Sequence, residues 1–332
     1  MRQSVLLRRY DYVQRMRLRP TLVLAAGIAA GFVLVLRHAP AQVSIPSREK
    51  AGSAPAEFPR TDLRIDRTEV LVPVSVNDSY NRPVAGLDKE HFRVFDDKVE
   101  QVITSFSMED EPVAVALVFD TSGSMRGAER EEHMAATEFF RTANPEDEFA
   151  LVEFDSSPRL VVPVTPDPAK ITYQLLFTHT RGSTALLDAV FMGLHEIKKS
   201  NRKRKALVVI SDGGENNSRY TTSEIKDVVK ESDVLIYSIG VFADPHYTDA
   251  GNVLNFISEQ TGGRMFRSQG ARLSDIAQKI SIDLRNRYLL GYVPSNRERD
   301  GRYHQVEVKI VPPKGLPPVR AHWRTGYYAP MD

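Results

Sequence analysis

Oxygen-bearing side chains are concentrated in one short stretch of the chain, Asp120-Thr121-Ser122-Gly123-Ser124. The stretch offers one carboxylate, from Asp120, and two hydroxyls, from Ser122 and Ser124. Gly123 lets the chain turn tightly between the two serines, so all three groups can face one point. Such a loop can bind a metal ion through oxygen atoms.

Two later residues extend this oxygen-only set. Asp212 lies in a Ser-Asp-Gly-Gly segment, and Thr184 follows Gly182-Ser183. Oxygen ligands without sulfur or imidazole favour Mg²⁺, Mn²⁺ or Ca²⁺ over zinc. Mg²⁺ takes about six oxygens, so five side chains, some acting through water, leave a position open for an outside carboxylate. The candidate metal ligands are Asp120, Ser122, Ser124, Thr184 and Asp212.

Residues suited to catalysis are scarce. The chain has no cysteine, which excludes thiolate metal sites, cysteine nucleophiles and disulfides. Gly213-Gly214-Glu215 lacks the Lys-Ser/Thr of a phosphate-binding loop. Near the metal only Glu215, Asp155 or His179 could act as a general base. We therefore expect no catalytic or cofactor-binding residues and no enzyme activity. No metal-ligand spacing links His91, His133, His179, His195, His246, His304 and His322.

The sequence patterns around these ligands predict an α/β domain, whose strands and helices must position them. Apolar runs without alternation are typical of parallel strands buried on both faces, and ligands of such sheets bind beyond the carboxyl ends of the strands. Helical patterns between the runs predict a doubly wound, Rossmann-like fold. The expected buried strands are 113–119, 206–210 and 234–241, with an edge hairpin at 148–154 and 160–164. The expected helices are 130–142, 184–199, 223–231, 252–261 and 273–286.

Segments of β pattern flank this domain. Before it, alternating residues over 70–77 and short strands around the Asp96-Asp97 turn predict a small sheet. Pro73 cannot donate a hydrogen bond, so we expect an open edge there. After it, strands are expected at 288–293, 303–311 and 319–328. Because neither segment can bury its apolar face alone, we infer one β-sandwich with the α/β domain inserted.

The first forty-one residues have an export pattern. Residues 2–19 carry six arginines and one acid, residues 22–36 are apolar apart from two glycines, and Ala39-Pro40-Ala41 follows. The apolar run is about fifteen residues long, shorter than the ~20 that cross a bilayer comfortably. A signal-anchor remains an alternative to a cleaved signal peptide, with residues 21–36 as a membrane tether. Either places the rest of the chain outside the cytoplasm, as a periplasmic, secreted or inner-membrane anchored protein.

Charge gives little indication of a partner. The formal net charge is +1, so no global field attracts nucleic acid, and we expect no nucleic-acid partner. The basic run Lys198–Lys205 could contact anionic lipid or nucleic acid. A solvated helix end explains it better, because cations are favoured at a helix C-terminus and the run precedes a parallel strand, away from the metal ligands.

The three ligand segments, in this order, resemble the metal-ion-dependent adhesion site of von Willebrand factor A (VWA) domains, which integrin I domains share. In that family an Asp-x-Ser-x-Ser loop, a Thr and an Asp bind the cation, and an acidic side chain of the ligand completes its coordination. All five positions match, and the resemblance covers about residues 111–286. The flanks Val84–Val94, Tyr288–Tyr292 and Gly326–Tyr328 resemble exported VWA-related proteins of Acidobacteria, which implies architecture and export.

We therefore expect an exported protein-binding or adhesion module that captures an acidic side chain of a protein through a divalent cation. The alternatives are a scaffold subunit of a cell-envelope assembly and, with less support, a metal-assisted hydrolase. The expected organisation is a signal peptide or signal-anchor (1–41), a linker (42–60), an N-terminal β segment (61–110), a VWA domain (111–286) and a C-terminal β segment (287–330).

Overall fold

The computed structural model describes residues 69–108, 111–242, 248–268, 271–296, 298–313, 315 and 317–331. The expected signal peptide or anchor, the possible tether at 21–36 and the linker at 42–60 lie outside the described residues. Among the described residues, no helix is both long enough and apolar enough to cross a membrane.

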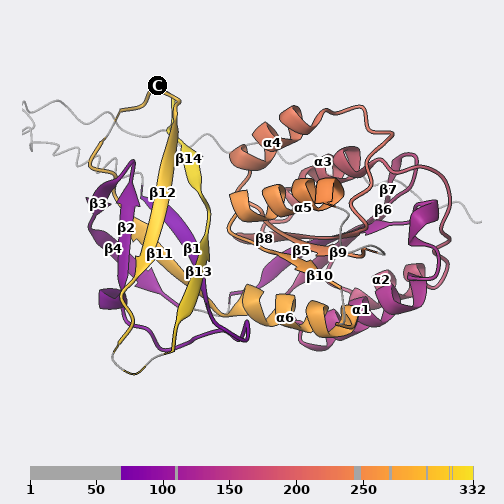
Figure 1. Cartoon of the computed structure of the whole chain (residues 1–332), viewed down its shortest axis with the longest axis horizontal. Coiled ribbons are helices and arrows are strands. Elements are labelled where there is room, and N and C mark those ends of the chain that lie inside the picture. The colour runs from indigo at the N-terminus through magenta and orange to yellow at the C-terminus, as the bar shows by residue number, and fades with distance from the viewer. Residues whose placement is uncertain are drawn as a thin grey trace, which may run out of the picture. The chain divides into compact units, whose positions relative to one another are not determined.

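A six-stranded sheet, parallel except at one edge, is the centre of the α/β part, which we define as residues 113–285 (Figure 1). Its middle strands are buried along their whole length or nearly so, which explains why their sequences do not alternate. The predicted hairpin lies at the edge, where the last two strands pair antiparallel. The strand order is β10 (Met265–Arg267), β9 (Leu235–Gly240), β8 (Arg204–Ser211), β5 (Val113–Asp120), β6 (Glu148–Phe154) and β7 (Pro158–Thr165).

Helices cover both faces of this sheet (Figure 1). One face carries α3 (Leu186–Ile197), α4 (Thr222–Glu231) and α5 (Thr248–Gln260), and the other carries α1 (Glu129–Arg141), α2 (Pro168–Leu175) and α6 (Leu273–Arg285). Two separate apolar clusters, one on each face, hold the helices to the strands. The predicted α/β class is confirmed.

The strands of the β part, residues 70–107 and 287–328, form two four-stranded sheets whose buried side chains make one apolar cluster. Each sheet contains strands from the segment before the α/β part and strands from the segment after it. The predicted domain limits stay predictions. The first sheet has the order β13 (Val319–Trp323), β1 (Val70–Asp78), β11 (Arg287–Tyr292) and β4 (Ile103–Ser107), and the second has the order β14 (Gly326–Tyr328), β12 (Tyr303–Ile310), β2 (Phe92–Asp96) and β3 (Val99–Gln101).

The expected strand over 319–328 is wrong, because the structure has two strands there in different sheets. The chain leaves β13 at Arg324 and Thr325, which are both held by the α/β part. Thr325 N donates to Gln260 O at 3.2 Å, and Arg324 forms an ion pair with Asp233. These contacts lie between the end of β13 in the first sheet and the start of β14 in the second, where the chain passes from one sheet to the other.

Smaller differences concern short elements. The eight-residue α2 and the three-residue β10 were not expected, although Asp167 caps α2 and a proline begins it. The helix expected from residue 184 begins at Leu186 instead. At Pro73, β1 pairs with β11, whereas β13 pairs only from Val74 onward, so one side of the strand is open at the proline.

Candidate metal site

Asp120 ends β5 inside the protein, with no measurable exposure. Its Oδ1 accepts a hydrogen bond from Ser122 N at 2.9 Å, and its Oδ2 accepts one from the Ser211 hydroxyl at 2.5 Å. Burial raises the pKa of Asp120 to about 6, against which these hydrogen bonds act, and the nearby charge of Asp212 raises it further. Both hydrogen-bond partners are neutral groups, so they do not balance the carboxylate charge.

The loop after Asp120 holds two hydroxyls close together. Ser122 Oγ and Ser124 Oγ lie 3.0 Å apart, on either side of the first residue of a 3₁₀ turn, η2 (Gly123–Met125). Gly123 N donates to Gly182 O at 3.1 Å and so ties this loop to the segment that precedes α3. The loop after β5 and the segment before α3 therefore lie next to each other at the end of the sheet.

Thr184 and Asp212 meet around Gly214. A Cβ placed on that glycine would lie 3.1 Å from Asp212 Oδ1 and 3.5 Å from Thr184 Oγ1. Thr184 N donates to the Asn216 side chain at 2.9 Å, and Asn216 N donates back to Thr184 O at 3.0 Å. The absence of a side chain at Gly214 thus leaves room for both oxygens, and Asn216 joins the two loops.

Exposure increases across the five predicted ligands. Asp120, Ser122 and Thr184 are buried, Asp212 is half-buried and Ser124 is exposed. The structure brings them to one end of the sheet, at the carboxyl ends of β5 and β8. Their oxygen-only donors fit a hard divalent cation, which would compensate the buried Asp120 charge and be reached from solvent beside Ser124.

Glu132 of α1 is a buried acid that sequence reasoning missed. It is 1% exposed, and its Oε1 has no hydrogen-bond partner among the described residues. Burial first, and then the charges of Asp120, Glu129 and Glu153, raise the pKa of Glu132 to about 8. A signal was present in the sequence, because Glu132 occupies the buried face of α1 with Ala135, Ala136 and Phe139.

Two of the three candidate general bases have structural partners. Glu215 accepts hydrogen bonds at both carboxylate oxygens, from Leu187 N at 3.0 Å and from the Ser218 hydroxyl at 2.7 Å among others. Asp155 pairs with Arg181 at 3.5 Å. His179 is exposed. Glu215 therefore holds the start of α3 against the Asp212 loop.

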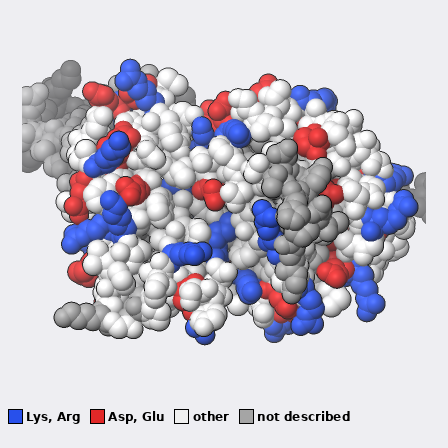
Figure 2. Space-filling view, viewed as in Figure 1, with Lys and Arg blue, Asp and Glu red and all other residues white. Residues whose placement is uncertain are grey.

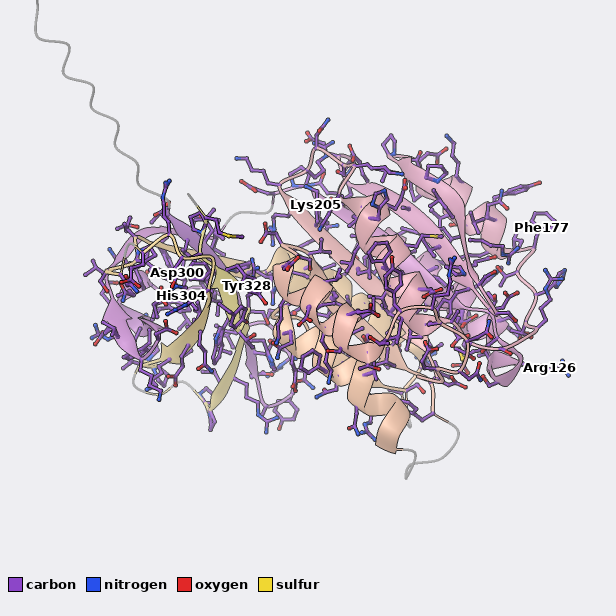
Figure 3. The ribbon with its side chains drawn as sticks, turned by 90° about the horizontal axis from the view of Figure 1, so that it is seen from above. Arg126, Phe177, Lys205, Asp300, His304 and Tyr328 are labelled. Carbon is purple, nitrogen blue, oxygen red and sulfur yellow. The ribbon has the colours of Figure 1, made fainter. Side chains whose placement is uncertain are left out.

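A small apolar surface lies on the segment that leads to this site. Tyr173, Leu176 and Phe177 have exposures of 60%, 63% and 59%, and the rings of Tyr173 and Phe177 are 5.1 Å apart. Phe177 lies toward the same end of the α/β part as Arg126, which directly follows η2, and Lys205 lies toward the other end (Figure 3). The basic run thus lies away from the predicted ligands, as expected.

Comparison with protein families matches residues 115–215 to the von Willebrand factor type A domain. The matched range contains all five candidate ligands, so the α/β part contains such a domain. A curated relative, a UPF0353 protein of Mycolicibacterium paratuberculosis, is 32% identical over 114 residues, which are 31% of this chain and 34% of that protein. The chain thus spans about a third of that relative's length.

Solved structures with similar folds include a von Willebrand factor type A protein of Catenulispora acidiphila, with 13% identity, a TM-score of 0.46 and coverage of 78% of this chain and 73% of that one. The conserved hypothetical protein BatB of Bacteroides thetaiotaomicron has 16% identity, a TM-score of 0.42 and coverage of 52% and 98%. The von Willebrand factor domain of a type V pili tip protein of Porphyromonas gingivalis has 15% identity, a TM-score of 0.43 and coverage of 53% and 97%.

Proposed function

We propose that this chain is an exported binding or adhesion module, in which the von Willebrand factor type A domain holds a divalent cation that captures a carboxylate of a protein partner. The cation is Mg²⁺, Mn²⁺ or Ca²⁺. The observation that carries the proposal is the fully buried Asp120 carboxylate at the end of β5, whose hydrogen-bond partners are both neutral. The proposed ligands of the cation are Asp120, Ser122, Ser124, Thr184 and Asp212.

The charge balance of these ligands favours an outside anion. Two of them, Asp120 and Asp212, are carboxylates, and the other three are hydroxyls. A hydroxyl ligand leaves more of the cation's charge unneutralised than a carboxylate does, so the bound ion keeps affinity for an acidic side chain. In the metal-free protein, burial keeps most of Glu132 protonated at neutral pH, so this acid adds little negative charge there.

The surface around the site supports a protein partner. The exposed side chains of Tyr173, Leu176 and Phe177 offer apolar contacts on the chain segment that precedes Thr184. On the face drawn in Figure 2, positive and negative side chains are interspersed. Recognition would therefore depend on the cation and on local apolar contacts, with little contribution from a broad charged surface.

Export is part of the proposal and rests on residues 1–41. A basic region, an apolar run and an Ala-x-Ala sequence would carry the folded part outside the cytoplasm, with cleavage or with residues 21–36 kept as a tether. Fractionation of the native host with an antibody against the chain tests this. Recovery in the cytoplasmic fraction would contradict export while leaving the cation proposal intact.

Cation binding is tested by titrating the full-length, metal-free chain with Mn²⁺ and recording the signal of the free ion by electron paramagnetic resonance. We expect one bound Mn²⁺ per chain that Mg²⁺ displaces, and a loss of at least ~100-fold in the affinity of this Mg²⁺-sensitive site for Mn²⁺ in Asp120→Asn. This substitution keeps the side chain's shape and removes its charge. Asp275→Asn, at a half-exposed position in the first turn of α6, is the matched control and should bind as the unmodified chain does.

Partner capture is then compared in extracts of the native host with Mg²⁺, with EDTA, and with Asp120→Asn. Cation-dependent capture that Asp120→Asn abolishes supports the adhesion module. Partners retained under EDTA and by Asp120→Asn favour a scaffold subunit, whose contacts lie elsewhere. Hydrolysis of a phosphoester or peptide that Asp212→Ala abolishes would instead favour a metal-assisted hydrolase.

A further inference from the structure

A second group of metal-ligating side chains lies in the β part, far from Asp120 in the fold. It comprises Asp96 at the end of β2, Asp97 in the turn that follows, and His304 in β12. Each offers one ligand atom, and these atoms all lie within 4.8 Å of one another. β2 and β12 are paired antiparallel, so the sheet register itself brings the three residues together.

Asp96 has one oxygen that is fully used and one that is not. Its Oδ2 accepts hydrogen bonds from the hydroxyls of Tyr292 at 3.0 Å and Tyr327 at 2.9 Å. Its Oδ1 is buried, has no hydrogen-bond partner among the described residues, and lies 3.7 Å from Nδ1 of His304. The two tyrosines therefore fix the carboxylate so that its unpartnered oxygen faces the histidine.

Asp97 supplies a carboxylate from the solvent side. Its Oδ1 accepts a hydrogen bond from Gln305 N at 2.9 Å, which holds the side chain in place. Its Oδ2 lies 2.9 Å from Nδ1 of His304, and the side chain is 54% exposed. This carboxylate is thus oriented and also open to water.

His304 is buried, with 8% of its side chain exposed, and its ring stacks on Tyr327. Its Nε2 has no hydrogen-bond partner in the described structure, although Asp300 Oδ1 is 3.8 Å away. Figure 3 shows Asp300 and His304 close together in the β part. A metal-bound histidine commonly donates its other ring N–H to a carboxylate, and Asp300 is placed for that role.

An ion pair alone does not account for this arrangement. It satisfies Nδ1 of His304 and one oxygen of Asp97, but it leaves Asp96 Oδ1 buried without a hydrogen bond among the described residues, 3.7 Å from Nδ1, which is costly for a carboxylate. A metal ion among the three atoms would satisfy all of them. Ligand atoms of a tetrahedral zinc ion are about 3.3 Å apart. His304 Nδ1 lies 2.9 Å from Asp97 Oδ2 and 3.7 Å from Asp96 Oδ1, on either side of that value, and all three atoms lie within 4.8 Å of one another.

We propose that Asp96 Oδ1, Asp97 Oδ2 and His304 Nδ1 form a second metal site, which binds a divalent transition-metal ion, with Zn²⁺ as the best fit. The imidazole distinguishes this site from the oxygen-only site at Asp120, because imidazole nitrogen favours zinc over Mg²⁺ or Ca²⁺. A cavity of about 220 Å³ lined by His304 and Tyr327 adjoins it. A water molecule that enters from the cavity, or from the solvent beside the exposed Asp97, would supply a fourth ligand.

The test uses the full-length chain without a histidine tag, carrying Asp120→Asn and Asp212→Asn to silence the first site. Calorimetric titration with Zn²⁺ should show one equivalent bound, and Co²⁺ should bind there with a visible absorption spectrum typical of four or five ligands. His304→Ala should remove both signals. Asp97→Asn, whose side chain can still accept from Gln305 N, should weaken Zn²⁺ at least tenfold without unfolding, and Asp300→Asn should weaken it ~10–100-fold.

His195→Ala is the matched control, because that histidine is exposed on α3, and it should leave Zn²⁺ binding unchanged. Zinc binding that survives both His304→Ala and Asp97→Asn, or no Zn²⁺ bound at micromolar concentrations by a folded chain, would overturn the second site and leave a simple ion pair. Neither outcome bears on the cation at Asp120, since that site is absent from the protein tested.

Discussion

Asp120 and Glu132 are two buried acids with different surroundings. Asp120 accepts hydrogen bonds from two donors and is followed by Ser122, which is buried, and Ser124, which is exposed to solvent. Glu132 lies on the buried face of α1 and has one oxygen without a partner among the described residues. Burial raises the pKa of both, to about 6 and about 8. At neutral pH, Asp120 is therefore largely a charged group that can bind a cation, whereas Glu132 is mostly protonated.

The raised pKa of Glu132 makes the metal-free protein less stable as pH rises. Between the ordinary value of 4.5 and about 8, the folded chain keeps a proton that the unfolded chain has lost. The free energy of unfolding therefore falls through this window, by a few kcal/mol at ~1.4 kcal/mol per pKa unit. Glu132→Gln should remove this fall, so it should raise stability at pH 8 and change it little at pH 4.5, as urea denaturation in EDTA would measure.

Glu131→Gln is the control for this prediction, because Glu131, the neighbour of Glu132 on α1, is exposed. It should leave the pH dependence as it is. If Glu132→Gln loses as much stability as the unmodified chain does between pH 5 and pH 8, the carboxyl is not the source of the effect. A bound cation should weaken the dependence, because it favours the ionised form of nearby acids.

At the scale of elements, the candidate site is held by loops that contact one another, and no single loop contains it. The loop after β5 is joined to the segment before α3 by the hydrogen bond from Gly123 N to Gly182 O. That segment is joined to the loop after β8 through Thr184 and Asn216. Loops are usually the mobile parts of a fold. Here their mutual hydrogen bonds let them hold five oxygens without large rearrangement.

Gly182 is a position at which this loop arrangement should be sensitive to a side chain. Its φ is +76°, and a Cβ there would lie 2.6 Å from the Ser156 hydroxyl, which accepts from Ser183 N. Gly182→Ala should therefore move the loop and weaken Mn²⁺ binding several-fold, in addition to the ~1–2 kcal/mol cost of a left-handed backbone. The Mn²⁺ titration and thermal denaturation together measure both effects.

Gly127→Ala separates the cost of the left-handed backbone from the effect of the contact with Ser156. Gly127 also has a positive φ, of +95°, but a Cβ there would meet nothing within 4 Å. It should lose similar stability with little change in Mn²⁺ affinity. Equal losses of affinity in both variants would show that the contact with Ser156 is not what positions the loop.

At the scale of the folded chain from residue 69 on, a buried polar network joins the β part to the α/β part. Asp283 of α6 accepts hydrogen bonds from Asn77 of β1, at 3.2 Å, and from the Tyr237 hydroxyl of β9, and it pairs with Arg264 at 3.4 Å. Burial alone would raise the pKa of Asp283, but Arg287 and Arg264 outweigh it, so the pKa is lowered. Such a network sets the two parts in one arrangement when every member is present.

Removing the Asp283 charge should destabilise the whole unit. Asp283→Asn leaves two arginines buried without their anion, which costs about 3–5 kcal/mol when one member of a buried pair is lost. Because the folded pKa lies below the ordinary 3.8, the charge stabilises the protein above that value and ceases to do so as pH falls further. The deficit of Asp283→Asn, measured by denaturation, should therefore be full at pH 7 and shrink below pH 4.

Asp275→Asn on the same helix is the control, since its side chain is half-exposed and pairs only with Arg272 in the described structure. It should change stability by less than about 1 kcal/mol. A deficit for Asp283→Asn that is no larger than this would mean that the network does not hold the two parts together.

The sequence by itself determined the features that depend on neighbours along the chain. The unbroken apolar runs required strands covered on both faces, which places Asp120 and Asp212 at strand ends without any knowledge of packing. The Asp-x-Ser-x-Ser spacing brings three oxygens into one loop for the same local reason. The proposed export signal is likewise a local pattern of residues 1–41.

Only the tertiary structure decided what lies beside what. Nothing local shows that a strand expected over 319–328 would divide between two sheets, or that Glu132 would be enclosed behind Asp120. Asp96 and His304 are separated by about two hundred positions, and only the pairing of β2 with β12 brings them together. The physical reason is that periodicity and turn chemistry act over a few residues, whereas pKa values, burial and ligand geometry depend on groups that packing brings near from elsewhere in the chain.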